Sequence, residues 1–259
     1  MVASSADAYW RLDAMPEATA DVAFPADPMA FYRWHGFSAM RGVVDPDLVA
    51  QAAEEARDLY ASVWDVEPGP MAEKSHRRHP AWRLDEATPA LRAIIGNPVI
   101  AETLSQAYGA PARFAAFEIF VRTPGQQGTD WHTDHPYIPV SGEVIHVWLP
   151  LIATESGRSL NYVTDLGSGP VGAHFAGMRP GDIAFHQYDV AHSGQTYPDA
   201  SVALSLVTFV DGSVLEPGEA RASSLGRNAF RERVFPDLAW GERVDTQEAP
   251  LMHDLVQGR

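Results

Sequence analysis

Between Ala112 and Val210 the sequence is a succession of short apolar runs, and this feature restricts the possible folds most strongly. The runs are rich in β-branched and aromatic residues and are separated by Gly, Pro and Asp, a pattern typical of β-strands joined by turns. They read RFAAFEIFVR, EVIHVWLPLIA, RSLNYV, DIAFHQY and SVALSLVTFV. A series of such strands within one segment predicts a β-sandwich or barrel.

The preceding part of the chain shows helical patterns instead. We expect a short helix over 27–34, a longer one over 46–60 and a third over 98–107, the last two beginning at Asp-Pro and Asn-Pro steps that suit a helix start. Residues 1–25 predict an irregular lead-in. The stretch 65–83 has proline, glycine and charge without periodicity, which predicts a long loop that could act as a lid.

The length of 259 residues fits one large domain. We therefore predict a single domain over 1–259. Within it, 1–111 is expected to be a mostly helical flank, 112–212 the β-core and 213–259 a C-terminal extension with weak helical character.

Composition narrows the classes of partner and of metal site. The chain carries 34 acidic and 19 basic residues, a formal net charge of −15, and its one lysine is Lys74. Such a chain is a poor ligand for nucleic acid or an anionic membrane, and two explanations of its acidity stay open: solubility, or attraction of a cationic substrate. There is no cysteine, so a metal must be held by His, Asp or Glu.

The N-terminus has no basic start followed by an apolar run, and no stretch approaches the roughly 20 apolar residues that span a bilayer. We expect a cytoplasmic protein. Two enzyme motifs fail: 167–172 matches G-x-G-x-x-G, but the prolines and glycines around it would break the helix that a dinucleotide site needs. A G-x-S-x-G elbow is absent.

The segment GTDWHTDHP contains His132 and Asp134 at i and i+2, which share one face of an extended chain. They could bind one metal ion together with a third ligand from elsewhere, and two histidines with one carboxylate form the facial triad of non-haem iron(II) oxygenases. Candidates for the third ligand are His146, His174, His186 and His192.

From Phe31 to Val210 the sequence resembles the phytanoyl-CoA dioxygenase (PhyH) family of iron(II)/2-oxoglutarate oxygenases. The similar segments are FYRWHGFSAMRGVVDPDLVAQAAEEARDLY, FEIFVRTPGQQGTDWHTDHPYI, HVWLPLIATESGRSLNYV and MRPGDIAFHQYDVAH. The resemblance implies a double-stranded β-helix, the jelly-roll barrel of the cupins, with flanking helices. It also implies Fe(II) and 2-oxoglutarate as cofactors, with O2 and a small molecule as co-reactants.

The resemblance assigns the metal ligands to His132, Asp134 and His192, with His186 and His174 as rivals for the third position. His186 lies on a predicted core strand, which favours a core or pocket histidine. An aspartate at position 134 argues against halogenation, because chloride would need its coordination position.

One family feature is missing. The family usually has an arginine about ten residues after the distal histidine, which binds the far carboxylate of 2-oxoglutarate, and Ser201 stands there. Arg122 and Arg158 are therefore predicted alternatives, because a guanidinium suits a carboxylate. Trp148 and Ser201 are also predicted to contact the cosubstrate. Arg179 is expected to be structural or exposed.

Substrate contacts are predicted at Glu118, His135 and Tyr137. Glu118 is a charge within an apolar run; if it faces the barrel interior it needs a partner, and outward orientation is the alternative. We expect oxidation of a C–H bond in a small, cationic natural product or amino-acid-like compound such as an aminoglycoside, with neutral substrates as the alternative. The missing arginine leaves open a rival function, a metal-binding cupin-like isomerase or binding protein without 2-oxoglutarate chemistry. The reaction outcome and the oligomeric state cannot be read from the sequence.

Overall fold

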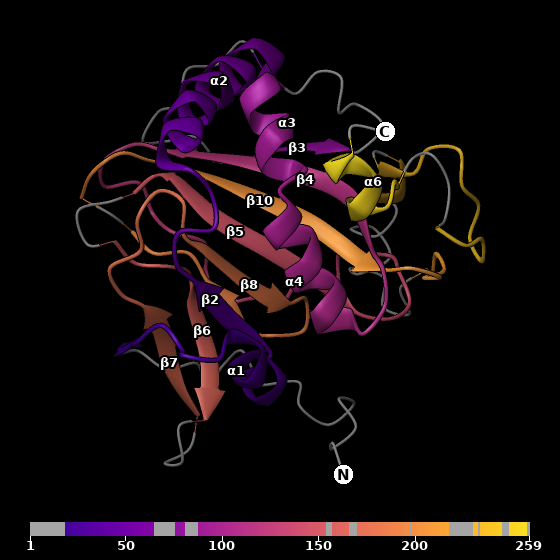
Figure 1. Cartoon of the computed structure of the whole chain (residues 1–259), viewed down its shortest axis with the longest axis horizontal. Helices are drawn as coiled ribbons and strands as arrows, with labels where there is room; N and C mark the ends of the chain where they lie inside the picture. Colours follow the sequence, from indigo (N-terminus) through magenta and orange to yellow (C-terminus); the bar gives the residue numbers. More distant parts are fainter. Residues whose placement is uncertain are drawn as a thin grey trace.

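The β-rich region predicted between Ala112 and Val210 supplies most of two sheets that pack together (Figure 1). The computed structural model describes residues 19–64, 76–80, 88–153, 157–165, 170–196, 198–217, 230–232, 234–244 and 249–257. The strands are β1 (Thr19–Val22), β2 (Phe37–Met40), β3 (His76–Pro80), β4 (Ala112–Arg122), β5 (Val144–Ile152), β6 (Asn161–Asp165), β7 (Pro170–Phe175), β8 (Ile183–Gln187), β9 (His192–Ser193) and β10 (Ser201–Val210). The helices are α1 (Pro28–His35), α2 (Pro46–Trp64), α3 (Pro89–Ile95), α4 (Pro98–Tyr108) and α6 (Met252–Val256).

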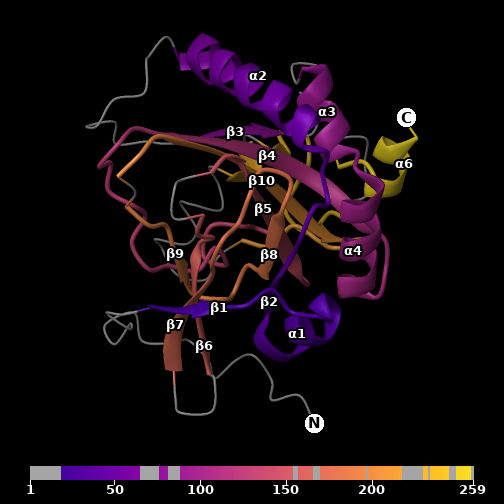
Figure 2. The ribbon, with the colours of Figure 1, turned by 60° about the vertical axis from the view of Figure 1, so that its left-hand side comes forward.

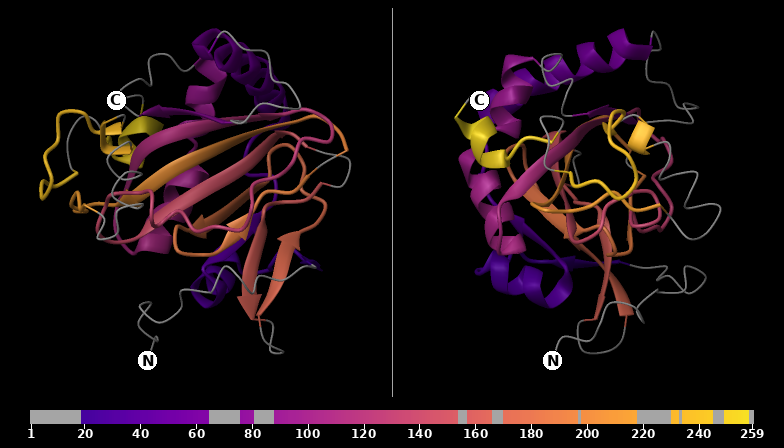
Figure 3. Two further views of the ribbon diagram at one scale, coloured as in Figure 1. Left: turned by 180° about the vertical axis from the view of Figure 1, so that it is seen from behind. Right: turned by 90° about the vertical axis from the view of Figure 1, so that its right-hand side faces the viewer.

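The larger sheet has the order β2-β8-β5-β10-β4-β3 and the smaller one β1-β7-β6-β9. All pairs are antiparallel except β1 with β7. Seen from two further directions, the smaller sheet lies across from the larger one, and the chain crosses between them after β8 (Figure 2; Figure 3). The predicted jelly-roll architecture is confirmed.

Alternation along β5 shows how one strand serves two faces of the larger sheet. Val147 and Leu149 belong to the core beneath the helices, whereas Trp148 belongs to the core between the two sheets. Successive side chains of a strand point to opposite faces, so His146 shares the inner face with Trp148. Helices α2, α3 and α4 cover the outer face (Figure 2).

The helix starts follow the predicted chemistry. The Asp27 carboxylate accepts the backbone N–H groups of Met29 and Ala30, 3.1 and 2.9 Å away, and Asn97 caps α4 in the same way. Gly36 ends α1 with φ +75°, a conformation that costs glycine little. The three predicted helices are confirmed as α1, α2 and α4. The sequence reading missed α3.

Two strands lie where none was expected. β1 falls in the predicted lead-in and β3 in the predicted 65–83 loop, whose remaining residues lie outside the described part. Each adds to a sheet edge or end, so β-pairing with the core stabilised segments that have little strand character of their own. Residues 170–172 of the predicted glycine-rich loop form the start of β7. None of the helices in the described part has the length and apolarity needed to cross a bilayer.

Candidate metal centre

The loop that follows β4 and the short strand β9 run side by side and bring His132 and His192 together. The two residues form an isolated antiparallel bridge. The N–H of His132 donates to the carbonyl of His192 at 2.9 Å, and the reverse bond is 2.8 Å long. Sixty residues and four strands separate these histidines in the sequence, so the jelly-roll crossing is what joins them.

Two glycines allow these backbones to approach so closely. A Cβ atom on Gly128 would lie 2.0 Å from the carbonyl oxygen of Gly194, and a Cβ on Gly194 would lie 2.7 Å from Nη2 of Arg122. The N–H of Gly194 donates to the Thr129 carbonyl at 2.9 Å. The sequence reading did not single out either glycine, since the need for a bare backbone appears only when both segments are in place.

Both histidines are oriented by their own neighbouring carbonyls. Nδ1 of His132 lies 2.7 Å from the carbonyl oxygen of Asp130, and Nδ1 of His192 lies 3.0 Å from that of Val190. A carbonyl oxygen only accepts, so each Nδ1 carries the proton. The lone pair of each ring is therefore on Nε2, the arrangement that metal-binding histidines use.

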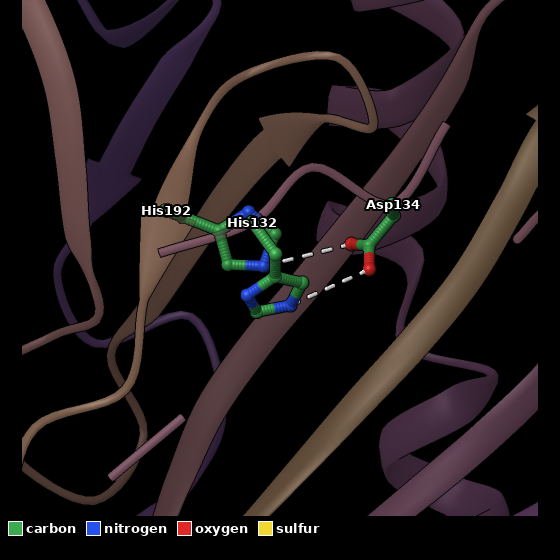
Figure 4. A group of neighbouring side chains, drawn as sticks. All are labelled: His132, Asp134 and His192. Atoms are coloured by element: carbon green, nitrogen blue, oxygen red, sulfur yellow. Dashed lines mark ion pairs between the residues drawn. The ribbon is translucent and has the colours of Figure 1, made fainter. Parts of the chain in front are cut away.

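Both Nε2 atoms face the carboxylate of Asp134 (Figure 4). Nε2 of His132 lies 3.8 Å from Oδ1, and Nε2 of His192 lies 3.6 Å from Oδ2. The three possible ligand atoms lie within 4.8 Å of one another, a spacing that one ion could span. The N–H of Asp134 donates to the Tyr188 carbonyl at 2.8 Å, which fixes the aspartate backbone.

The electrostatics of this group suit a cation. Burial by itself would raise the pKa of Asp134, but the surrounding histidines hold it well below its usual range, so the carboxylate stays ionised. Burial lowers the pKa of His192 to about 3, which keeps its imidazole neutral at pH 7. An ionised carboxylate beside the neutral imidazole of His192 offers ligands in the protonation states that a divalent metal requires.

Asp134 also contacts two further histidines on the inner face of the larger sheet. Nδ1 of His146 and Nε2 of His186 lie 3.6 and 3.9 Å from Oδ2. His146 and His186 are paired across β5 and β8, with rings stacked at 5.4 Å. His186 thus lies beside Asp134 on the inner face of the larger sheet. His174 is remote, since its Nε2 pairs with Asp21 at 2.7 Å.

A small cavity, open to solvent on one side, lies further along the same inner face. Its lining includes three residues predicted to contact the cosubstrate, Trp148, Arg158 and Ser201. Trp148 follows His146 by two residues on the same face of β5, a distance of about 7 Å. The cavity therefore begins next to the histidine cluster.

Comparison with known proteins agrees with this geometry. Residues 32–156 match the family model of phytanoyl-CoA dioxygenase (PhyH). This part of the chain is therefore similar to the PhyH family. The matched part includes His132 and Asp134 but ends before His192. No curated protein matches the sequence.

Among solved structures, the chain is similar to the non-haem α-ketoglutarate-dependent epimerase SnoN of nogalamycin biosynthesis, with a TM-score of 0.71 and 20% identity over 87% of this chain and 96% of that one. The similarity to the carbocyclase SnoK of the same pathway has a TM-score of 0.68 and 17% identity, over 90% of this chain and 99% of that one. The similarity to the non-haem monooxygenase ThoJ has a TM-score of 0.59 and 15% identity, over 90% of this chain and 100% of that one. At these identities the similarity establishes the fold.

Arg122 is not among the residues that line the cavity, although it lies opposite one of them, Ser201, in the pairing of β4 with β10. Its Nη1 donates to the Gln195 carbonyl and its Nη2 to the Thr129 hydroxyl, both at 3.1 Å. Arg122 thus joins the segment that carries His132 to the segment that carries His192. This arrangement gives Arg122 a part in holding the centre together.

The predicted substrate residues lie in different settings. Glu118 is buried, and it alternates with Phe117 and Ile119, which face the helices; it therefore points to the barrel interior, one of the two orientations considered above. His135 stacks edge-on against Tyr188, with ring centroids 4.9 Å apart. Tyr137 is half exposed at the molecular surface.

Proposed function

We propose that this protein is an iron(II)/2-oxoglutarate-dependent oxygenase that oxidises a C–H bond of a small molecule. The observation that carries the proposal is the convergence of the Nε2 atoms of His132 and His192 on the ionised Asp134. Two neutral imidazoles and one carboxylate fit iron(II) and leave coordination positions for other ligands. The family match supports the same assignment.

Each residue of the centre has a definite task. His132, Asp134 and His192 would hold the metal, while the Asp130 and Val190 carbonyls keep both imidazoles in the ligating tautomer. Bound iron would allow O2 to act as the oxidant; 2-oxoglutarate would supply two electrons as it is converted to succinate and CO2, and the substrate C–H bond would supply the other two.

The cosubstrate is proposed to extend from the metal into the cavity beside Trp148. Arg158 and Ser201 line this cavity, and a guanidinium with a hydroxyl group can bind a carboxylate. Arg158 thus replaces the arginine that the family has near position 201. Arg122 is less suited, because its guanidinium already donates to Gln195 and Thr129.

Arg158→Gln is expected to weaken 2-oxoglutarate binding by about 10- to 100-fold, the scale of one charge-assisted hydrogen bond, while iron content stays unchanged. Calorimetric titration of the manganese-loaded protein measures this. Arg179→Gln is the control, since Arg179 is exposed and outside the cavity lining. An unchanged dissociation constant for Arg158→Gln would show that another residue anchors the cosubstrate.

For the substrate we propose a cationic, amine-bearing natural product or amino-acid-like compound, of which aminoglycosides are one class. The net charge of −15 would attract such a molecule. The buried, inward-facing Glu118 offers a carboxylate on the same sheet face as the cavity. Because the related folds include an epimerase, a carbocyclase and a monooxygenase, hydroxylation, ring closure and epimerisation are all reaction outcomes to assay.

Succinate release with amino-sugars, basic amino acids and neutral metabolites tests the substrate class. With a cationic substrate, kcat/KM is expected to fall as salt rises, because screening removes long-range attraction. Glu118→Gln should raise KM more than it lowers kcat. The exposed Glu102→Gln serves as control. Turnover confined to neutral or anionic compounds would exclude a cationic substrate, and a metal-loaded protein that never consumes 2-oxoglutarate would favour the cupin-like alternative.

A further inference from the structure

Asp134 is shared by two pairs of histidines. Its carboxylate forms one compact group with His132 and His192 and a second with His146 and His186, and within each group the possible ligand atoms lie within 4.8 Å of one another. Both groups consist of two imidazoles and one carboxylate. The proposed oxygenase chemistry uses only the first.

We propose that Asp134, His146 and His186 form a second site for a divalent transition-metal ion, next to the first and bridged to it by the Asp134 carboxylate. The donors would be Oδ2 of Asp134 with Nδ1 of His146 and Nε2 of His186, which lie 3.6 and 3.9 Å from that oxygen. The site goes beyond the proposed oxygenase function and does not depend on 2-oxoglutarate.

The state of His186 points to a ligand. Its side chain is only 2% exposed, and neither ring nitrogen has a hydrogen-bond partner among the described residues. Buried polar atoms are nearly always satisfied, and those that are not need an explanation such as an ion. A metal bound at Nε2 would provide the missing partner.

The fold holds the donor atoms of His146, His186 and Asp134 close enough together to bind one metal ion. β5 and β8 place His146 opposite His186 in the ladder, so their rings are held on one face and stack at 5.4 Å. Asp134 comes from the loop that also carries His132, and this loop is fixed by the bond of its N–H to the Tyr188 carbonyl. Three separate segments thus deliver the three donors.

The donor set also indicates which ions would bind. Two imidazole nitrogens and one carboxylate oxygen suit Zn²⁺, Co²⁺ or Ni²⁺ and not Mg²⁺ or Ca²⁺, which prefer oxygen. Because the carboxylate would be shared, the second ion is expected to bind more weakly than the first. Excess zinc would therefore fill both positions.

Equilibrium dialysis of the full chain against Zn²⁺, with metal analysis of the protein, tests the second site. The wild type should hold two zinc ions per chain, His186→Gln one, and Asp134→Ala none. The double variant His132→Ala/His192→Ala gives the sharpest result, because it lacks both imidazoles of the first group and should still hold one ion. His174→Gln, a buried histidine outside both groups, should hold two. Circular dichroism verifies that each variant is folded.

A folded His132→Ala/His192→Ala double variant that holds no zinc would overturn the proposal. A wild type that holds one ion, unchanged by His186→Gln, would overturn it equally. Neither result bears on the oxygenase function, which is tested by 2-oxoglutarate binding to the iron-loaded wild type. A second ion in a protein that ignores 2-oxoglutarate would support the new site and contradict the proposed function.

Discussion

Asp134→Ala is expected to eliminate both iron binding and turnover. The substitution removes the carboxylate on which His132 and His192 converge and leaves only neutral nitrogen donors. A catalytic metal contributes several kcal/mol of transition-state stabilisation, so turnover should fall by about 10³-fold or more at 1.4 kcal/mol per tenfold. Metal analysis after dialysis and an assay of succinate release measure the two effects.

Asp130→Ala is the matched control for this change. Asp130 lies in the same loop and is exposed, and the bond it forms to Nδ1 of His132 comes from its backbone carbonyl, which alanine keeps. This variant should retain its iron. Full iron content and full turnover in folded Asp134→Ala protein would show that Asp134 is not a metal ligand.

Gly128→Ala is expected to disrupt the centre without touching any metal-binding side chain. The added Cβ would lie 2.0 Å from the Gly194 carbonyl oxygen, and because that oxygen belongs to the backbone, the two chain segments must separate. Overpacking of this kind costs about 1–3 kcal/mol or more, which lowers Tm by roughly 2–4 °C per kcal/mol in a chain of this size. Iron affinity should fall as well, since the same segments carry His132 and His192.

Gly125→Ala is the control that distinguishes the steric clash from the backbone strain of replacing a glycine with positive φ. Gly125 lies in the same loop at φ +74°, and a Cβ there would meet nothing within 4 Å. Gly125→Ala should lower the free energy of unfolding by only about 1–2 kcal/mol, the cost of placing a non-glycine residue in the left-handed conformation. Iron binding should be preserved. Equal iron affinity in wild type and Gly128→Ala would mean that the close approach to Gly194 is not needed for the centre.

The sequence indicated the β-core because its strands are long, apolar and bounded by turn residues. It did not indicate β1 and β3, since the residues of Thr19–Val22 and His76–Pro80 have weak strand preference and pair only because a finished sheet offers them an edge. Helix starts were predictable at Asp27 and Asn97, where a side chain that caps the helix precedes a proline, whereas α3 was missed at Thr88-Pro89, where the threonine side chain makes no capping hydrogen bond.

Some residues of the site can likewise be identified from the local sequence, whereas others come together only through the long-range arrangement of the fold. The spacing of His132 and Asp134 is local and could be read directly, and the family resemblance supplied His192. The approach of His146 and His186 to the same carboxylate depends on the register of β5 with β8. The requirement for Gly128 depends on the approach of Gly194. Neither of these two contacts can be recognised from a short stretch of sequence.

The most direct measurement of the central claim is the visible absorption of the iron(II)-loaded protein when 2-oxoglutarate is added without oxygen. If His132, Asp134 and His192 hold iron with open positions beside the cavity at Trp148, the cosubstrate should chelate the metal. A metal-to-ligand charge-transfer band should then appear, and it should be absent in Asp134→Ala. An iron-loaded wild type that shows no band at saturating 2-oxoglutarate would contradict the account.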